Sequence, residues 1–171
     1  MDLTADTQRR PVAGVMGAAV ATAESLAHAE RLGELLAQQG WIVLTGGRPF
    51  GVMEAASRGA KRVSGSLTIG ILPTADETPS AFVDVAIRTD LGHGRNNVNV
   101  LSSDVVFACG VEGPGTASEV ALALKNGRPV VLVAPGEAAR AFFSELGGEL
   151  VRIVASSEAA VRAGQDILLS R

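Results

Sequence analysis

The stretch Gly110-Val-Glu-Gly-Pro-Gly-Thr-Ala-Ser-Glu-Val-Ala-Leu-Ala-Leu-Lys125 decides how the centre of this chain folds. It begins after the apolar run Val105–Cys109, whose length and β-branched and aromatic content are typical of a buried strand. It ends in Val120–Leu124, which are good helix formers except for the valine. Glycines and a threonine lie between these two runs. The sequence therefore predicts a strand, a tight glycine loop and a helix.

The residues of this loop also indicate a binding function. The first N–H groups of the predicted helix point into the loop, where the helix dipole favours an anion. Gly113 and Gly115 would let a phosphate approach the backbone closely. We therefore interpret the stretch as a phosphate-binding turn in which Glu119 is a reactive or positioning carboxylate. The alternative is a capping box, with Thr116 as the N-cap and Glu119 as its partner, because T-x-x-E is that pattern too. The stretch by itself leaves both interpretations open.

Strands and helices alternate along the whole chain. The predicted strands span residues 12–16, 41–45, 67–72, 83–87, 105–109, 130–133 and 150–154. The predicted helices span 21–39, 52–61, 137–146 and 157–169, with further helices beginning near residue 95 and after the glycine loop. This order predicts an α/β protein: a three-layer α/β/α Rossmann-like fold with a mainly parallel central sheet of about seven strands. We expect residues 1–10 to be a flexible segment and residues 11–171 to form a single domain.

Composition narrows the possible partners. The net charge is −3 and the basic residues are scattered, which argues against a nucleic-acid partner. No apolar run approaches the roughly 18 residues of a membrane span, so we predict no membrane partner. The N-terminus shows no secretory pattern, and the single cysteine, Cys109, falls in a predicted buried strand. These features predict a cytoplasmic protein whose cysteine packs as a small hydrophobic residue.

Two further turns carry residues suited to an anion. Strand 41–45 runs into a second glycine turn, where Arg48 could pair with a phosphate or simply be solvated. In a parallel sheet both glycine turns open at the carboxyl edge, where ligands bind in open α/β folds. His93 and Arg95–Asn97 gather polar groups at a helix start, which suits an anion but also suits helix caps and loop hydrogen bonds.

These motifs resemble a known superfamily. The pattern G-G-R-x-x-G-V-M-x-A-A-x-x-G-A at Gly46–Ala60, G-x-G-T-x-x-E at Gly113–Glu119 and H-x-R at His93–Arg95 are similar to the lysine-decarboxylase-like, or LONELY GUY-related, proteins. The resemblance is closer still to the molybdenum cofactor carrier branch, through G-P-G-T-A-x-E-V-A-L-A-L-K and the upstream R-x-N-x-N-x-L-S-S. It covers residues 12–169.

The resemblance implies a Rossmann-like sheet and homo-oligomers, which are dimers in the enzymes and tetramers in the carriers. The enzymes are phosphoribohydrolases that cleave the N-glycosidic bond of nucleoside 5′-monophosphates. Their functional arginine and glutamate match Arg95 and Glu119. Such a role is chemically reasonable, because a carboxylate can stabilise the positive charge that builds on the ribose ring.

Two departures weaken the transfer of that activity. The enzymes have P-G-G-x-G-T where this chain has Val111–Thr116, so Glu112 brings an extra carboxylate that would repel a phosphate unless it points away. The lysine that follows the enzymes' arginine is Asn96 here. Fewer cations and one more carboxylate favour a binding site over the enzymes' catalytic site.

The leading hypothesis is therefore a protein that binds and carries the molybdenum cofactor, molybdopterin monophosphate, without altering it. The pterin's dithiolene would hold the metal, so we expect no metal ligated by the protein. The alternatives are a phosphoribohydrolase that uses Arg95 and Glu119, and a regulatory module that binds a nucleotide without turnover. We expect a homo-oligomer, dimer or tetramer, joined through the apolar helix Val120–Leu124. The expected cofactor-binding residues are Gly17, Gly46, Gly47, Arg48, Gly51, Arg95, Asn96, Asn99, Gly113, Pro114, Gly115, Thr116 and Glu119.

Overall fold

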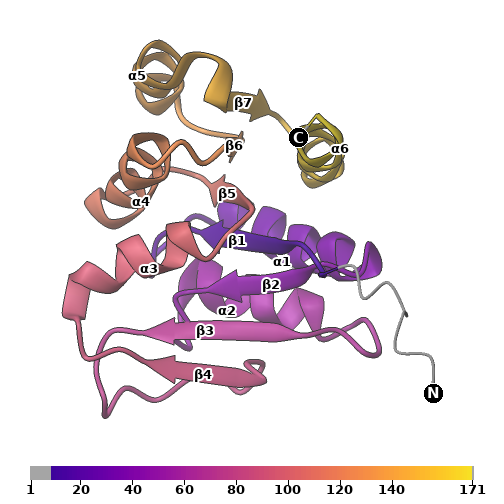
Figure 1. The fold of residues 1–171 in the computed structure, drawn as a ribbon, viewed down its shortest axis with the longest axis vertical. Coiled ribbons are helices and arrows are strands. Elements are labelled where there is room, and N and C mark those ends of the chain that lie inside the picture. The colour runs from indigo at the N-terminus through magenta and orange to yellow at the C-terminus, as the bar shows by residue number, and fades with distance from the viewer. Residues whose placement is uncertain (1–8, 171) are drawn as a thin grey trace, which may run out of the picture.

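The computed structural model describes residues 9–170, which form a seven-stranded sheet with helices on both faces (Figure 1). Neighbouring strands pair in parallel throughout, in the order β4-β3-β2-β1-β5-β6-β7. The strands are β1 (Val12–Met16), β2 (Ile42–Thr45), β3 (Thr68–Leu72), β4 (Val85–Arg88), β5 (Val105–Cys109), β6 (Val130–Val133) and β7 (Val151–Val154). The predicted three-layer fold is confirmed.

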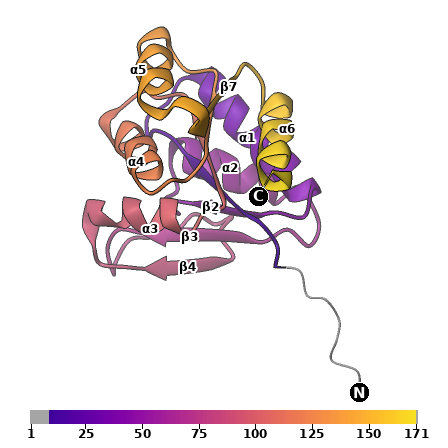
Figure 2. The same ribbon diagram turned by 45° about the horizontal axis from the view of Figure 1, so that its top comes forward.

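The helices divide between the two faces of the sheet. They are α1 (Ala23–Gln38), α2 (Gly51–Ala60), α3 (Arg95–Leu101), α4 (Pro114–Lys125), α5 (Glu137–Gly147) and α6 (Ser157–Leu169), with short 3-10 turns η1 (Gly92–Gly94) and η2 (Gly148–Leu150). One core cluster joins the sheet to α1, α2 and α6, and a second joins it to α3, α4 and α5. Both layers can be followed in Figure 2. Strand β5 contributes to both clusters: Phe107 packs in the first and Val106 packs in the second.

The strand order places a reversal between β1 and β5. From β1 the chain adds strands in one direction as far as β4, and it then returns to the other side of β1 to add β5, β6 and β7. The connections that leave β1 and β5 therefore run to opposite faces of the sheet. This divergence opens a crevice at the carboxyl ends of these two strands, which is where open α/β folds bind ligands.

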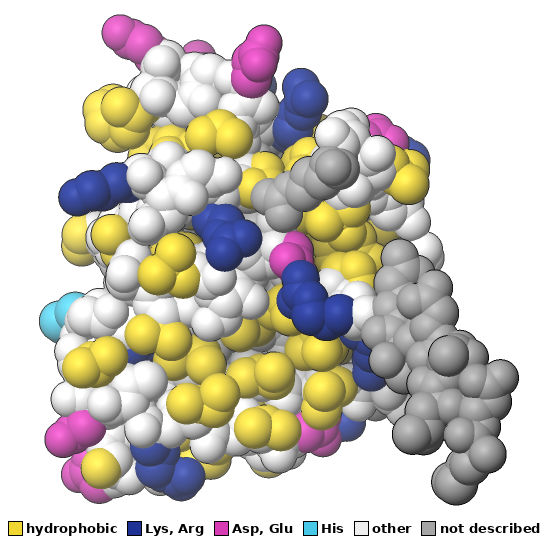
Figure 3. All heavy atoms as spheres, in the orientation of Figure 1, with side chains coloured by type: hydrophobic (Ala, Val, Ile, Leu, Met, Phe, Trp, Pro, Cys, Tyr) yellow, Lys and Arg dark blue, Asp and Glu magenta, His cyan; other side chains and the backbone are white. Residues whose placement is uncertain are grey.

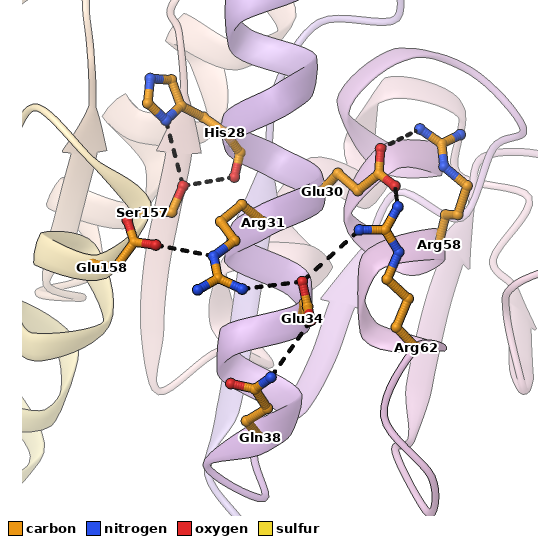
Figure 4. Close-up of polar contacts among 9 residues, drawn as sticks. All are labelled: His28, Glu30, Arg31, Glu34, Gln38, Arg58, Arg62, Ser157 and Glu158. Atoms are coloured by element: carbon orange, nitrogen blue, oxygen red, sulfur yellow. Dashed lines mark hydrogen bonds and ion pairs between the residues drawn. The ribbon is translucent and has the colours of Figure 1, made fainter.

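The two faces are covered unevenly. Across β3 and β4 the pairs Ile69–Val85 and Ile71–Ile87 lie side by side, on the face that carries α3. Val85 and Ile87 are each 43% exposed. Figure 3 shows hydrophobic side chains gathered over the β3–β4 end of this face. On the opposite face, ion pairs join the helices to one another (Figure 4). Glu30 of α1 accepts a hydrogen bond from Arg58 at 2.7 Å and also pairs with Arg62. Arg31 donates to Glu158 of α6 at 2.9 Å.

Cys109 is buried, as expected, and burial raises the pKa of its thiol to about 12. Residues 1–8 of the predicted flexible segment lie outside the described residues. Arg9 donates to Asp104, and Arg10 donates to the Gly40 carbonyl. Within residues 9–170, no helix is long and apolar enough to cross a membrane.

Candidate functional site

A cleft of about 300 Å³ lies at the carboxyl ends of β1 and β5. Four segments of the chain form it: the end of β1 with the loop that follows, the turn after β2, the start of α3, and the turn into α4. Its lining residues are Val15, Met16, Gly17, Ala18, Ala19, Val20, Gly46, Arg48, Met53, His93, Arg95, Asn96, Glu112, Gly113, Pro114, Gly115, Thr116 and Glu119. The glycine turns predicted from the sequence therefore meet at one place.

The N-terminus of α4 faces this cleft without a cap. Gly113 is the N-cap residue, Pro114 is the first helical residue, and no side chain caps the helix. The first helical hydrogen bond runs from the Ala117 N–H to the Gly113 carbonyl, which leaves the N–H groups of Gly115 and Thr116 without an intrahelical partner. The Thr116 hydroxyl is buried and has no hydrogen-bond partner. Three donors thus belong to the first turn of α4, which is a position suited to an anion.

The capping-box alternative is wrong. Thr116 is the third residue of α4 and not its N-cap, because Pro114 already occupies the first helical position. Glu119 does not return to the start of its helix: its Oε1 accepts a hydrogen bond of 3.1 Å from Asn99 Nδ2 of α3. Glu119 therefore contacts the neighbouring helix α3, and it does not make the capping-box contact with the start of its own helix.

Arg95 and Glu119 form a buried ion pair at the cleft. Arg95 is 8% exposed and Glu119 is 6% exposed, and Arg95 Nη1 lies 3.6 Å from Glu119 Oε1. Burial raises the pKa of Glu119 to about 7, although Arg95 and Asn99 oppose this shift. Burial also lowers the pKa of Arg95, against the attraction of Glu119. Gly46 provides the room for the guanidinium, since a Cβ at that position would lie 2.6 Å from Arg95 Nη1.

The other predicted residues divide into those that line the cleft and those that support it. Arg48 lines the cleft and is held by Glu77 at 3.1 Å. Asn96 also lines it and donates to Ser118 at 3.1 Å. Asn99 lies behind the cleft, against Glu119. Gly47 and Gly51 belong to the turn after β2 but do not line the cleft. Beside Gly51, the Val52 N–H donates a hydrogen bond of 3.1 Å to the Ala18 carbonyl.

Sequence reasoning did not identify one wall of the cleft. Ala18, Ala19 and Val20 follow β1 and line the cleft, together with Met16 and Met53. Small apolar side chains have no functional group that would mark them in a sequence as binding residues. Their position after the first strand, opposite the glycine turn, was the only available clue.

Glu112 does not leave its carboxylate in the anion position at α4. Its carboxylate accepts hydrogen bonds from the Ser25 hydroxyl at 2.7 Å, the Thr22 hydroxyl at 2.8 Å and the Thr22 N–H at 3.1 Å. All three donors belong to the start of α1. These contacts direct the carboxylate toward α1, a different helix. Glu112 therefore repels an anion at the start of α4 less than its sequence position suggests.

A parallel sheet with a cleft at its strand reversal, bordered by glycine turns and an uncapped helix start, defines a Rossmann-like protein of the open α/β class. The chain belongs to the SLOG cluster4 family, whose model matches residues 10–161. The family resemblance expected from the motifs is thus confirmed.

Relatives and solved structures extend this result. An uncharacterised protein of Archaeoglobus fulgidus is 43% identical over 122 residues, which are 71% of this chain and 79% of the relative. The structure of the molybdenum cofactor binding protein from Rippkaea orientalis matches with a TM-score of 0.90 and 49% identity, over 95% of this chain and 99% of that chain. The molybdenum cofactor carrier protein of Chlamydomonas reinhardtii matches with a TM-score of 0.89 and 45% identity, over 94% and 99% of the two chains.

The raised pKa of Glu119 predicts how stability depends on pH. Because the pKa rises from 4.5 to about 7 on folding, the folded protein keeps a proton that the unfolded chain loses. Wild type should therefore lose stability relative to Glu119→Gln as the pH rises between these values, by about 1.4 kcal/mol per pH unit, and the difference should then level off. Urea unfolding from about pH 4 to pH 8 measures this. Glu145→Gln, which changes an exposed carboxylate of α5, is the control; parallel wild-type and Glu119→Gln curves would contradict the prediction.

Proposed function

We propose that this protein binds the phosphorylated pterin of the molybdenum cofactor and stores or carries it without altering it. The observation that carries this proposal is the uncapped start of α4, where the free N–H groups and the buried, unpartnered Thr116 hydroxyl meet at the cleft. Support comes from the two solved structures whose names describe molybdenum cofactor binding and carrier proteins, at 45–49% identity over nearly the whole chain.

The residues present suit such a ligand. The phosphate would lie at Gly113–Thr116, with Arg95 supplying positive charge from the side of the cleft. The apolar wall of Met16, Ala18–Val20 and Met53 would face a flat heterocycle, and the Asn96 amide would be within the same cleft to bond its polar edge. The cofactor's metal would be held by the pterin's own dithiolene. We also propose that the protein acts in the cytoplasm.

Thr116 allows binding to be tested separately from folding. Replacing Thr116 by Val removes a hydroxyl that has no partner in the protein, so stability should not fall. If the hydroxyl donates to the cofactor's phosphate, affinity should fall by about tenfold or more, since a hydrogen bond to a charged group is worth about 1.5–3 kcal/mol. Anaerobic titration of the purified protein with the cofactor, followed by its absorbance, measures the affinity.

A matched control is available for this variant. Ser57 of α2 also buries a hydroxyl without a partner, but it does not line the cleft. Ser57→Ala should bind as wild type does. The absence of saturable cofactor binding by the wild-type protein would refute the proposed function.

A second candidate function is supported by the Arg95–Glu119 pair. Its position at the cleft is what a phosphoribohydrolase would need to hold a nucleoside monophosphate and stabilise the charge on its ribose. The raised pKa of Glu119 argues against this role, because a large share of the carboxylate is protonated near neutral pH. Asn96 also stands where the enzymes have a lysine.

Incubation with AMP distinguishes the two functions. We expect no release of adenine above the rate given by Glu119→Ala, with the products separated by chromatography. Adenine released by the wild type alone would make the protein an enzyme and would assign Glu119 its catalytic role.

We further infer that the chain forms a homo-oligomer, either a dimer or a tetramer. In the helix expected to join the subunits, Val120 and Ala123 pack in the core, Leu122 and Leu124 are half-buried, and Ala121 is exposed. The exposed apolar side chains of β4 and of Leu101 in α3 add a second surface that a copy of the chain could cover. Light scattering should give a multiple of the 17.5 kDa chain mass, and a monomer mass would refute this inference.

A further inference from the structure

Two helix starts lie near the carboxyl ends of β1 and β5, and they differ in their relation to the cleft: the start of α4 lines it, whereas the start of α1 does not line it but holds Glu112, which does. Helix α1 follows β1 and helix α4 follows β5, so both begin at the strand reversal. The start of α4 is open. The start of α1 already holds an anion, the carboxylate of Glu112, which comes from the loop that leads into α4.

The carboxylate of Glu112 is held at the start of α1, beside the Thr22 side chain that caps this helix by accepting from the Ser25 N–H. Its Oε2 accepts from the Thr22 N–H, and its Oε1 accepts from the hydroxyls of Thr22 and Ser25. Burial opposes ionisation of this group, but the hydrogen bonds from Ser25 and Thr22 outweigh burial and lower its pKa. Glu112 is therefore a carboxylate at neutral pH, and it supplies the negative charge that a helix start favours.

The surrounding backbone is shaped to accept this side chain. At Gly110 the backbone has a φ of +61°, and a Cβ there would lie 2.5 Å from Ser25 Oγ and 3.1 Å from Glu112 Oε1. A larger residue at position 110 would therefore force apart the contact between the loop and α1. The position of the carboxylate depends on this glycine and on two hydroxyls, so it is a built feature of the site.

We propose that Glu112 limits the cleft to ligands with a single phosphate group, by filling the anion position at α1 and leaving only that at α4. A pyrophosphate that spans the crevice would place its second phosphate against a fixed negative charge. The selected ligands are thus monophosphates, and compounds that join two groups through a pyrophosphate are excluded. This inference rests on the proposed function, because it assigns the ligand's phosphate to α4.

Glu112→Gln tests the inference, since it removes the charge and nearly preserves the shape. We would titrate inorganic phosphate and pyrophosphate into the protein and follow binding by calorimetry. The ratio of the pyrophosphate Kd to the phosphate Kd should fall by about tenfold or more in the variant, because a fixed repulsive charge has been removed. Glu112→Ala, which adds no amide donor opposite Thr22, should shift the ratio in the same direction.

The control is Glu24→Gln, which neutralises a carboxylate in the first turn of α1 that is 77% exposed and does not line the cleft. This variant should keep the wild-type ratio.

An unchanged ratio in both Glu112 variants, or an equal shift in Glu24→Gln, would overturn the inference while leaving the phosphate position at α4 intact. Failure of the wild type to bind phosphate would overturn both the inference and the phosphate position. Discrimination between the two anions without cofactor binding would overturn only the proposed function.

Discussion

The parallel pairing of β1 with β5 is the constraint on which the site depends. These strands are neighbours in the sheet, but their connections leave toward opposite helical layers, so a crevice opens at their carboxyl ends with the start of α4 on its wall. If both connections left toward the same helical layer, no crevice would open there, and the glycine turns would only link strands to helices. It also explains how Glu112, which precedes α4, can reach the first turn of α1, some 90 residues away in sequence.

Much of the fold was predictable because local signals agreed with one another. Apolar runs such as Val105–Cys109 and Val130–Val133 are too short for helices, and the stretches between them have helical periodicity. The approximate bounds of most elements followed from these patterns. The beginning of α4 did not, because T-x-x-E fits both a capping box and the interior of a first turn. Pro114 was the sequence feature that pointed to the correct start.

The site was only partly predictable, since some of its properties arise from contacts between distant residues. Residue types and spacing indicated the positions of Arg95, Glu119 and Thr116. The raised pKa of Glu119 depends on burial beneath the packed helices, and its partner Asn99 belongs to another helix. The wall formed by Ala18–Val20 has no polar group that could mark it. The role of Glu112 was equally hidden, because its sequence position suggested repulsion and gave no indication of its contacts with Thr22 and Ser25.

The unpartnered Thr116 hydroxyl has a consequence for the lifetime of the protein. A buried donor without a partner makes the free form less stable than it would be with that group satisfied. A ligand that binds only the folded chain stabilises it by about 2.7 kcal/mol at a hundred times its Kd. Empty molecules therefore open more often than loaded ones and are exposed more often to proteases. The amount of this protein in a cell would then follow the supply of its ligand, without any change in its synthesis.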